Sequence, residues 1–175
     1  MNGNIESGME FAEQAENYFK IESCPTMRAL NVKTCDFIIA KKSGVQTRVF
    51  LIEAKSSAPK PLQDNTTQKE PWEKFLQNIC EKMVTTLLVF IGLKVGRHYS
   101  QLSDLPDTIA QAVLGDLSIT PCLVLKEHPP YALFQISDAL KIRLQPIVKS
   151  FVLDQPIVIN AEMAIENGLV NRIIS

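Results

Sequence analysis

The stretch 34-TCDFIIAKKSGVQTRVFLIEAKSS-57 contains two apolar segments separated by a short polar one. Residues 32–41 form an apolar run of strand length, and residues 47–54 form a second run rich in Val, Phe, Leu and Ile. The intervening residues 42–46 are mostly polar, include Gly44 and form a segment short enough for a turn. The sequence therefore predicts a β-hairpin, and the interpretation of the rest of the chain depends on it.

The second strand of this hairpin ends in charged residues. Side chains alternate between the two faces of a strand, so Glu53 and Lys55 share the face of Leu51, whereas Ile52 and Ala54 lie on the opposite face. Both faces are apolar before Glu53, which predicts a central strand covered on both sides. Glu53 and Lys55 then emerge at its end, about 6.6 Å apart along one face.

An aspartate lies in the preceding strand, where Asp36 shares a face with Thr34 and Ile38. Pairing of the two strands can bring Asp36 next to Glu53. Two carboxylates a few ångströms apart repel each other unless one is protonated or a cation bridges them, and carboxylate oxygens suit Mg²⁺. The pattern predicts a Mg²⁺ site at Asp36 and Glu53. The Lys55 ammonium would hold or help to deprotonate an attacking water, or offset charge that builds on phosphorus.

The same three residues fit a second interpretation, a surface ion-pair cluster that caps the strand ends. A Glu-x-Lys triplet by itself is common at ordinary composition. Here the triplet at Glu53 is the only [DE]-x-K in the sequence, it ends an apolar strand, and an aspartate precedes it across a turn. This context favours the metal site.

The chain has 175 residues, of which 46% are apolar and 21% are charged. This length is enough for one domain with a substantial core and is short for two. The composition is close to that of average soluble globular proteins. We therefore expect a single domain over residues 1–175.

Charge is distributed unevenly along the chain. The 18 basic and 19 acidic residues leave a net charge of -1, which argues against a non-specific nucleic-acid binder. The segment 28–60 has seven basic and two acidic residues, an excess at which a polyanion could dock. A solvated loop face would have the same composition, so both interpretations stay open.

Two further features concern the compartment. The four cysteines lack CxxC spacing and the N-terminus lacks a signal pattern, which predicts reduced thiols and a cytoplasmic protein. The apolar run 83–93 is shorter than the ~20 residues that cross a bilayer. It is predicted to be a buried helix, with no membrane partner.

The N-terminal segment 5–19 has apolar residues at helical spacing, which predicts an opening helix. At about 100° per residue, Glu16 falls near the centre of the apolar stripe and Glu13 at its margin. A carboxylate among apolar residues is a functional candidate. A helix that frays before Glu16 would instead leave that side chain solvated.

The remaining segments complete an α/β pattern with a mixed central sheet. The expected elements are a short strand at 18–22, a helix at 71–94, a strand at 121–126, a helix from 136 to about 144 capped by Ser137 and stopped by Pro146, a strand at 157–159, and a short helix between Asn160 and Gly168.

The acidic hairpin followed by a helix and a strand resembles the PD-(D/E)xK nuclease superfamily, which has the restriction-endonuclease-like fold. The resemblance covers about residues 5–126, so that 131–175 would be a C-terminal strand and helix extension. It implies a core made of a helix, a three-stranded meander, a second helix and a further strand. The motif is degenerate, so the resemblance concerns fold and chemistry more than substrate.

By this resemblance, Asp36 matches the metal-binding aspartate, Glu53 the second metal ligand and Lys55 the catalytic lysine. Glu16 matches the acidic residue that many members present from the first helix, with Glu13 as its substitute. The residue before the aspartate is cysteine where the motif has proline, a departure that removes no ligand. The resemblance implies Mg²⁺ as the cofactor, with Mn²⁺ able to replace it.

Two functions follow as hypotheses. The first is a metal-dependent nuclease that hydrolyses phosphodiester bonds of nucleic acid, with DNA as the expected partner, in restriction, phage defence or repair. The second is a catalytically inactive module of the same fold that serves a larger nucleic-acid-processing complex. Cutting both strands of a duplex would suit a homodimer. DNA or RNA, strand and sequence specificity, and internal or terminal cleavage stay open.

Overall fold

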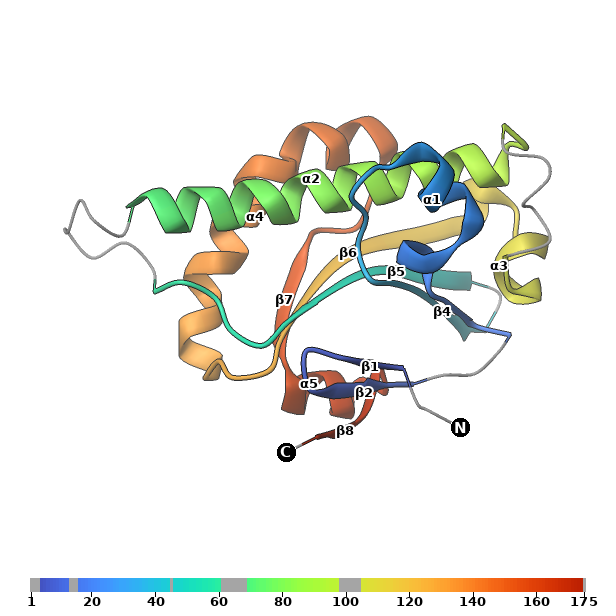
Figure 1. Ribbon diagram of the computed structural model, residues 1–175. Helices are drawn as coiled ribbons and strands as arrows, with labels where there is room; N and C mark the ends of the chain where they lie inside the picture. The colour runs from blue at the N-terminus through green and yellow to red at the C-terminus, as the bar shows by residue number, and fades with distance from the viewer. Residues whose placement is uncertain (1–3, 13–15, 45, 61–68, 98–104, 175) are drawn as a thin grey trace.

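A mixed five-stranded sheet forms the centre of the structure, a computed structural model that describes residues 4–12, 16–44, 46–60, 69–97 and 105–174 (Figure 1). The strand order is β3-β4-β5-β6-β7. Neighbours pair antiparallel from β3 to β5 and parallel from β5 to β7. The bounds are Tyr18–Phe19 (β3), Phe37–Ser43 (β4), Gln46–Lys55 (β5), Leu117–Leu125 (β6) and Ile157–Asn160 (β7).

The predicted hairpin is formed by β4 and β5. Their register runs from the Phe37–Ile52 pair to the Ser43–Gln46 pair. The central position of β5 is confirmed, because it lies between β4 and β6 and its residues 49–54 are all buried. The first strand begins five residues later than predicted, so Asp36 directly precedes β4.

The strand predicted at 121–126 is longer at its N-terminal end, since β6 begins at Leu117. Pro121 lies inside this strand although proline cannot donate to a sheet. Pairing with β7 begins only at Cys122, so at Pro121 the strand has one sheet neighbour, β5. The missing N–H is tolerated because β6 is locally an edge strand there.

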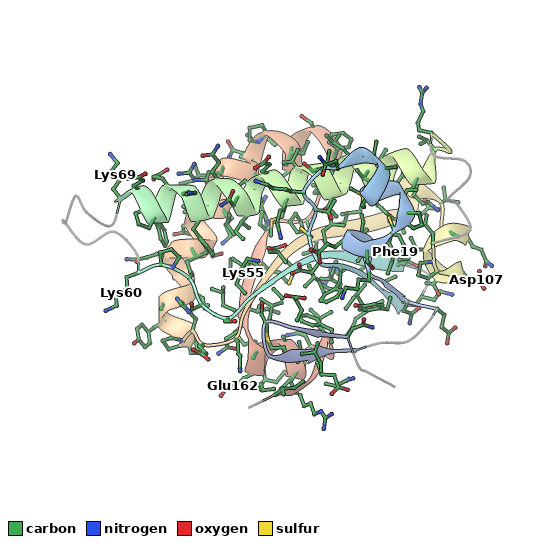
Figure 2. The ribbon with its side chains drawn as sticks, in the orientation of Figure 1. Phe19, Lys55, Lys60, Lys69, Asp107 and Glu162 are labelled. Carbon is green, nitrogen blue, oxygen red and sulfur yellow. The ribbon has the colours of Figure 1, made fainter. Side chains whose placement is uncertain are left out.

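Helices cover one face of the sheet (Figures 1 and 2). The long helix α2 runs across this face, and its buried side chains include Leu76, Met83 and Leu87. The helices on this side are α1 (Pro25–Leu30), α2 (Lys69–Lys94), α3 (Asp107–Gln111) and α4 (Pro130–Phe151), with 3-10 turns at Ile21–Ser23 (η1) and Leu114–Asp116 (η4).

The helix α2 agrees with the prediction of a buried helix through residues 83–93. By length and composition alone α2 could also cross a membrane, with a mean hydropathy of 1.3 over its most apolar window. Core helices pass the same test, and 44% of that window is buried inside the structure. Its buried residues pack on the sheet and on α4.

The prediction for α4 is wrong at both ends. The helix begins at Pro130, with Pro129 as its N-cap, so Ser137 lies inside it rather than at its start. Pro146 also lies inside the helix instead of ending it. A stripe of buried residues that spans the helix explains the extension, because packing on the sheet outweighs the local cost of proline. This stripe contains Leu133, Ile136, Leu140, Leu144 and Val148.

The opposite face of the sheet is covered by a short helix and a second small sheet. The small sheet has the order β1-β2-β8 and joins the two ends of the chain. Asn160 caps the short helix as predicted, since its side chain accepts a hydrogen bond from the Met163 N–H at 2.9 Å. The elements on this side are β1 (Ile5–Glu6), β2 (Met9–Phe11), α5 (Ala161–Glu166) and β8 (Val170–Ile173).

The opening helix predicted at 5–19 is wrong. The chain reverses at Ser7 and Gly8, both at positive φ, and β1 then pairs with β2. Met9 and Phe11 are buried on either side of the half-buried Glu10, a strand alternation. Pairing of β2 with β8, more than 150 residues away, stabilises the strand form. Glu16 lies exposed in a turn before β3, and Glu13 lies outside the described residues.

Candidate active site

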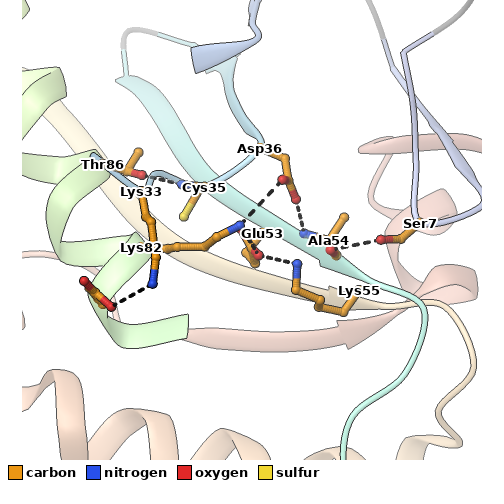
Figure 3. Close-up of polar contacts among 10 residues, drawn as sticks. Ser7, Lys33, Cys35, Asp36, Glu53, Ala54, Lys55, Lys82 and Thr86 are labelled. Atoms are coloured by element: carbon orange, nitrogen blue, oxygen red, sulfur yellow. Dashed lines mark hydrogen bonds and ion pairs between the residues drawn. The ribbon is translucent and has the colours of Figure 1, made fainter. Parts of the chain in front are cut away.

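Three of the predicted residues meet beneath α2, at the edge of the sheet where β4 begins and β5 ends (Figure 3). Asp36 is buried, and no part of Glu53 is exposed. Lys55 lies at the end of β5 with 36% of its side chain exposed. The structure therefore gathers two buried carboxylates and a partly solvated ammonium in one place.

Asp36 is held against the neighbouring strand by two hydrogen bonds. Its carboxylate Oδ2 accepts from the Ala54 N–H at 2.8 Å, and its own N–H donates to the Ile52 carbonyl at 3.0 Å. The second carboxylate oxygen, Oδ1, is directed toward Lys82 (Figure 3). Asp36 thus has a defined orientation at the start of β4.

Glu53 receives two ammonium groups on one oxygen. Its Oε1 lies 2.5 Å from the Lys55 Nζ and 2.7 Å from the Lys82 Nζ. Its Oε2 is buried and has no hydrogen-bond partner among the described residues. A buried oxygen without a partner is costly, so Oε2 has free capacity to bind a donor or a cation.

Lys82 was missed by the sequence interpretation. It projects from the middle of α2, and its Nζ lies 4.0 Å from the Asp36 Oδ1 as well as close to Glu53. One turn later, Thr86 is fully buried and its Oγ1 accepts the Cys35 N–H at 2.7 Å. The sequence did contain a signal for Lys82. Lys82 and Thr86 are polar residues four apart within an apolar helix, and that spacing puts both on one face.

The electrostatics of the cluster follow from burial and charge. Burial raises the pKa of Asp36. Burial, together with the charge of Asp36, raises the pKa of Glu53. Burial alone would lower the pKa of Lys82, but its hydrogen bond and ion pair with Glu53 outweigh this and raise it. Lys82 therefore stays charged, and positive charge at this place stabilises the two ionised carboxylates.

Two further carboxylates lie beside Asp36. Carboxylate oxygens of Glu6, Glu22 and Asp36 all lie within 4.8 Å of one another. Glu6 comes from β1 and is half-buried, whereas Glu22 is exposed on the turn η1. Burial and the charges of Asp36 and Glu22 raise the pKa of Glu6. Neither residue was predicted, because each depends on a segment folding back onto β4.

The N-terminal turn is attached directly to the site. Ser7 donates its hydroxyl to the Ala54 carbonyl at 3.1 Å, next to the N–H that binds Asp36 (Figure 3). This hydrogen bond places the adjacent residue, Glu6, near Asp36. The exposed Glu16 has no equivalent attachment to the sheet edge among the described contacts.

A cavity of about 250 Å³ opens beside the lysines, between β5 and α2. Glu53 forms part of its wall, and apolar side chains of α2 form another part. Its lining residues are Lys33, Glu53, Lys55, Phe75, Asn78, Ile79 and Lys82. A substrate group with negative charge would meet three ammonium groups here.

The basic residues of segment 28–60 do not form one surface around this cavity. Lys33 and Lys55 line it. Lys41 and Arg48 lie opposite each other in the β4–β5 register, near the hairpin turn at the other end of the strands. Lys41 donates to the Asn167 carbonyl, and Arg48 lies 3.5 Å from Asp154. The basic excess is therefore divided between the two ends of the hairpin.

The donor set fits a hard divalent cation. Four carboxylates, from Glu6, Glu22, Asp36 and Glu53, stand against the two ammonium groups of Lys55 and Lys82. With all six groups ionised, their charges sum to -2, and the Lys20 ammonium acts on the cluster from beside Glu6. Carboxylate oxygens suit Mg²⁺ or Mn²⁺, and the unpartnered Glu53 Oε2 is one such oxygen.

No protein-family model, curated protein or solved structure matches this chain. The chemistry of the cluster therefore has to be inferred from its geometry.

Proposed function

We propose that the protein is a metal-dependent nuclease that hydrolyses phosphodiester bonds of nucleic acid. The observation that carries the proposal is the meeting of Asp36, Glu53 and Lys55 at one sheet edge, with both carboxylates buried and the lysine reaching solvent. Buried carboxylates that crowd one another are unfavourable unless cations offset their charge, and Lys55 and Lys82 offset only part of it when Glu6 and Glu22 lie close by. In a site for phosphodiester hydrolysis, the carboxylates would bind a metal ion and the lysine would face the phosphate.

The strand order supports a restriction-endonuclease-like core. The strands β3, β4 and β5 form an antiparallel meander, α2 follows, and β6 then pairs with β5. One departure concerns the first helix, since the described part of residues 5–19 is strand and turn. In the proposal, Glu6 or Glu22 takes the place that the resemblance gave to Glu16.

Each residue has a role in the proposed reaction. Asp36 and Glu53 would hold the ion, with Glu6 and Glu22 beside them, and the ion would supply Lewis acidity to a phosphate oxygen. The Ala54 N–H keeps Asp36 oriented. The oxygen of a water molecule forms a bond to phosphorus while the P–O3′ bond breaks. The attacking water gives up a proton to solvent and the leaving O3′ takes one up, which leaves a 3′-hydroxyl and, by analogy with the family, a 5′-phosphate. Lys55 orients this water or offsets the charge that develops on phosphorus.

The substrate class and setting belong to the same proposal. DNA is the first polyanion to test, and Lys33 and Lys55 at the cavity favour a negatively charged ligand. The four cysteines are all free thiols, which agrees with the cytoplasmic location we propose. A homodimer would let two such sites cut both strands of a duplex.

The proposal is tested by cleavage of supercoiled plasmid, linear duplex, single-stranded DNA and RNA in Mg²⁺, Mn²⁺ or EDTA. Wild type is compared with Lys55→Ala and Asp36→Ala. We expect metal-dependent cutting that each substitution reduces by at least about 100-fold, a typical loss when one group that stabilises developing charge is removed. Lys149→Ala, an exposed lysine on α4, is the control for loss of surface charge.

Cutting that persists in EDTA or in Lys55→Ala would contradict the proposal. Absence of cutting together with absence of Mn²⁺ binding would favour the second function, an interaction module. One observation favours that alternative specifically: α4 exposes Tyr131, Phe134 and Ile142, large apolar side chains that a partner protein could cover.

A further inference from the structure

We propose that Lys82 is an internal placeholder for the metal ion: its ammonium lies against Glu53 on the side that faces Asp36, and it has to leave before one ion can bind both carboxylates. The inference rests on the proposed metal site and concerns how that site is filled. It gives a function to a lysine from α2 that lies outside the Glu-x-Lys triplet.

The distances place the Lys82 ammonium against Glu53, on the side that faces Asp36 and close to where a bridging ion would lie. Its Nζ is 2.7 Å from the Glu53 Oε1 and 4.0 Å from the Asp36 Oδ1, whereas the ion pair of Lys55 is with Glu53 (Figure 3). A Mg²⁺ ion bound to both carboxylates would need oxygen distances of about 2.0–2.1 Å. The ammonium and the ion therefore compete for one position.

Burial makes this competition strong. Only 21% of the Lys82 side chain is exposed, and Glu53 is fully buried. Charges in such a place are screened weakly by solvent, so an ammonium a few ångströms from a divalent ion repels it strongly. The Glu53 Oε2 has no partner in the described part of the chain, so the carboxylate keeps a second acceptor for an ion that replaces the ammonium at Oε1.

The structure also offers the ammonium another place. The cavity of about 250 Å³ beside the site is lined by Lys82 itself and by Asn78, which lies one turn earlier on α2. A lysine stem has several rotatable bonds, so a change of rotamer moves its ammonium several ångströms without moving the helix. The side-chain amide oxygen of Asn78 can accept a hydrogen bond from the displaced ammonium.

The experiment measures Mn²⁺ binding by calorimetry to the metal-stripped protein and to Lys82→Met, which keeps an unbranched stem without charge. We expect Mn²⁺ to bind Lys82→Met about tenfold more tightly, since one nearby like charge changes the cation affinity of a carboxylate site by this order or more. Mn²⁺ should also raise the melting temperature of Lys82→Met more than that of wild type.

Lys33→Met is the matched control. Lys33 lines the same cavity and its Nζ lies 3.8 Å from Glu81, away from the site carboxylates. The Lys33→Met variant removes the same charge but leaves the Lys82 ammonium in place beside Glu53. We expect its Mn²⁺ affinity to stay within about twofold of wild type, as for a solvent-screened charge. Equal gains in both variants would show a general charge effect and overturn the inference.

The remaining outcomes distinguish the placeholder role of Lys82 from the proposed nuclease function. If wild type binds Mn²⁺ and Lys82→Met binds it equally or more weakly, the placeholder is wrong while the proposed nuclease stands. If only Lys82→Met binds, the placeholder is supported and the metal-dependent function of wild type fails. If neither binds, both fail.

Should Lys82→Met not fold, Lys82→Arg gives the answer. A guanidinium can contact both carboxylates and is harder to displace, so Mn²⁺ should bind this variant several-fold more weakly. Wild-type affinity in Lys82→Arg would overturn the inference.

Discussion

Asp154 lies in a network remote from the candidate site, at the side of β6. Its Oδ2 accepts hydroxyl hydrogen bonds from Ser118 at 2.5 Å and Thr120 at 2.6 Å, and the Arg48 Nε lies 3.5 Å away. Burial alone would raise the pKa of Asp154, but these two hydrogen bonds and the arginine outweigh it and lower the pKa. The environment thus favours the ionised carboxylate here, whereas it disfavours that of Asp36.

This difference predicts how stability depends on pH. A carboxylate whose folded pKa is depressed stabilises the fold above its unfolded pKa of about 3.9, and this contribution is lost as pH falls through the folded pKa. Asp154→Asn should therefore lower the free energy of unfolding at pH 7 by about 1 kcal/mol, discounted for partial exposure. The deficit should shrink at pH 3, as measured by urea denaturation.

Asp138→Asn is the control for this residue, because the ion pair that Asp138 makes with Lys141 at 3.9 Å is exposed. Its cost should stay below about 0.5 kcal/mol at either pH. If Asp154→Asn lowers the free energy of unfolding equally at pH 7 and pH 3, the stabilisation does not come from the ionised Asp154 carboxylate.

At the scale of elements, α4 ends in an unfavourable backbone conformation. Val152, directly after the helix, has φ 53 and ψ 46, the left-handed region that glycine adopts at helix ends. Its N–H still donates to the Val148 carbonyl, so the residue completes the C-terminal cap. A β-branched side chain makes this conformation costly, by about 1–2 kcal/mol.

Val152→Gly should therefore raise the free energy of unfolding by about 0.5–1 kcal/mol, after the entropy that glycine adds to the unfolded chain. No buried contact is lost, because Val152 is 90% exposed. Urea denaturation measures the change. Val152→Ala, which retains a Cβ, should gain less, and a glycine variant less stable than wild type would refute the strain.

At the scale of the whole molecule, the candidate site combines distant parts of the chain. Glu6 arrives from the N-terminal strand β1, which is held by β2 and, through it, by the C-terminal strand β8. Phe11 of β2 packs on Phe37 of the hairpin, with ring centroids 4.7 Å apart. The small sheet that joins the two termini thus delivers a carboxylate to Asp36.

Glu6→Gln should weaken Mn²⁺ binding about tenfold, as loss of a group that supports a metal site typically does. Glu16→Gln removes the same charge from an exposed turn and should leave the affinity unchanged. Calorimetry compares the Mn²⁺ affinity of the two variants. Glu6 is the acid that the fold places beside Asp36, and Glu16 is the acid expected from helical periodicity. Weaker binding only in Glu16→Gln would restore the original assignment.

Much of the sheet and half of the candidate site could be predicted from local pattern. Strand alternation depends only on residues two apart, so the hairpin and the shared position of Asp36, Glu53 and Lys55 were accessible from the sequence. The Asn160 cap is equally local, because its side chain bonds to a backbone N–H three residues later.

What local pattern could not predict depends on contacts between distant segments. The same residues at 5–12 satisfy a helical and a strand spacing, and pairing with β8 selects the strand. Pro146 disfavours a helix locally, yet packing of α4 on the core extends it. Glu6, Glu22 and Lys82 reach Asp36 only after β1, η1 and α2 have packed around it, so their place beside Asp36 is a property of the folded chain.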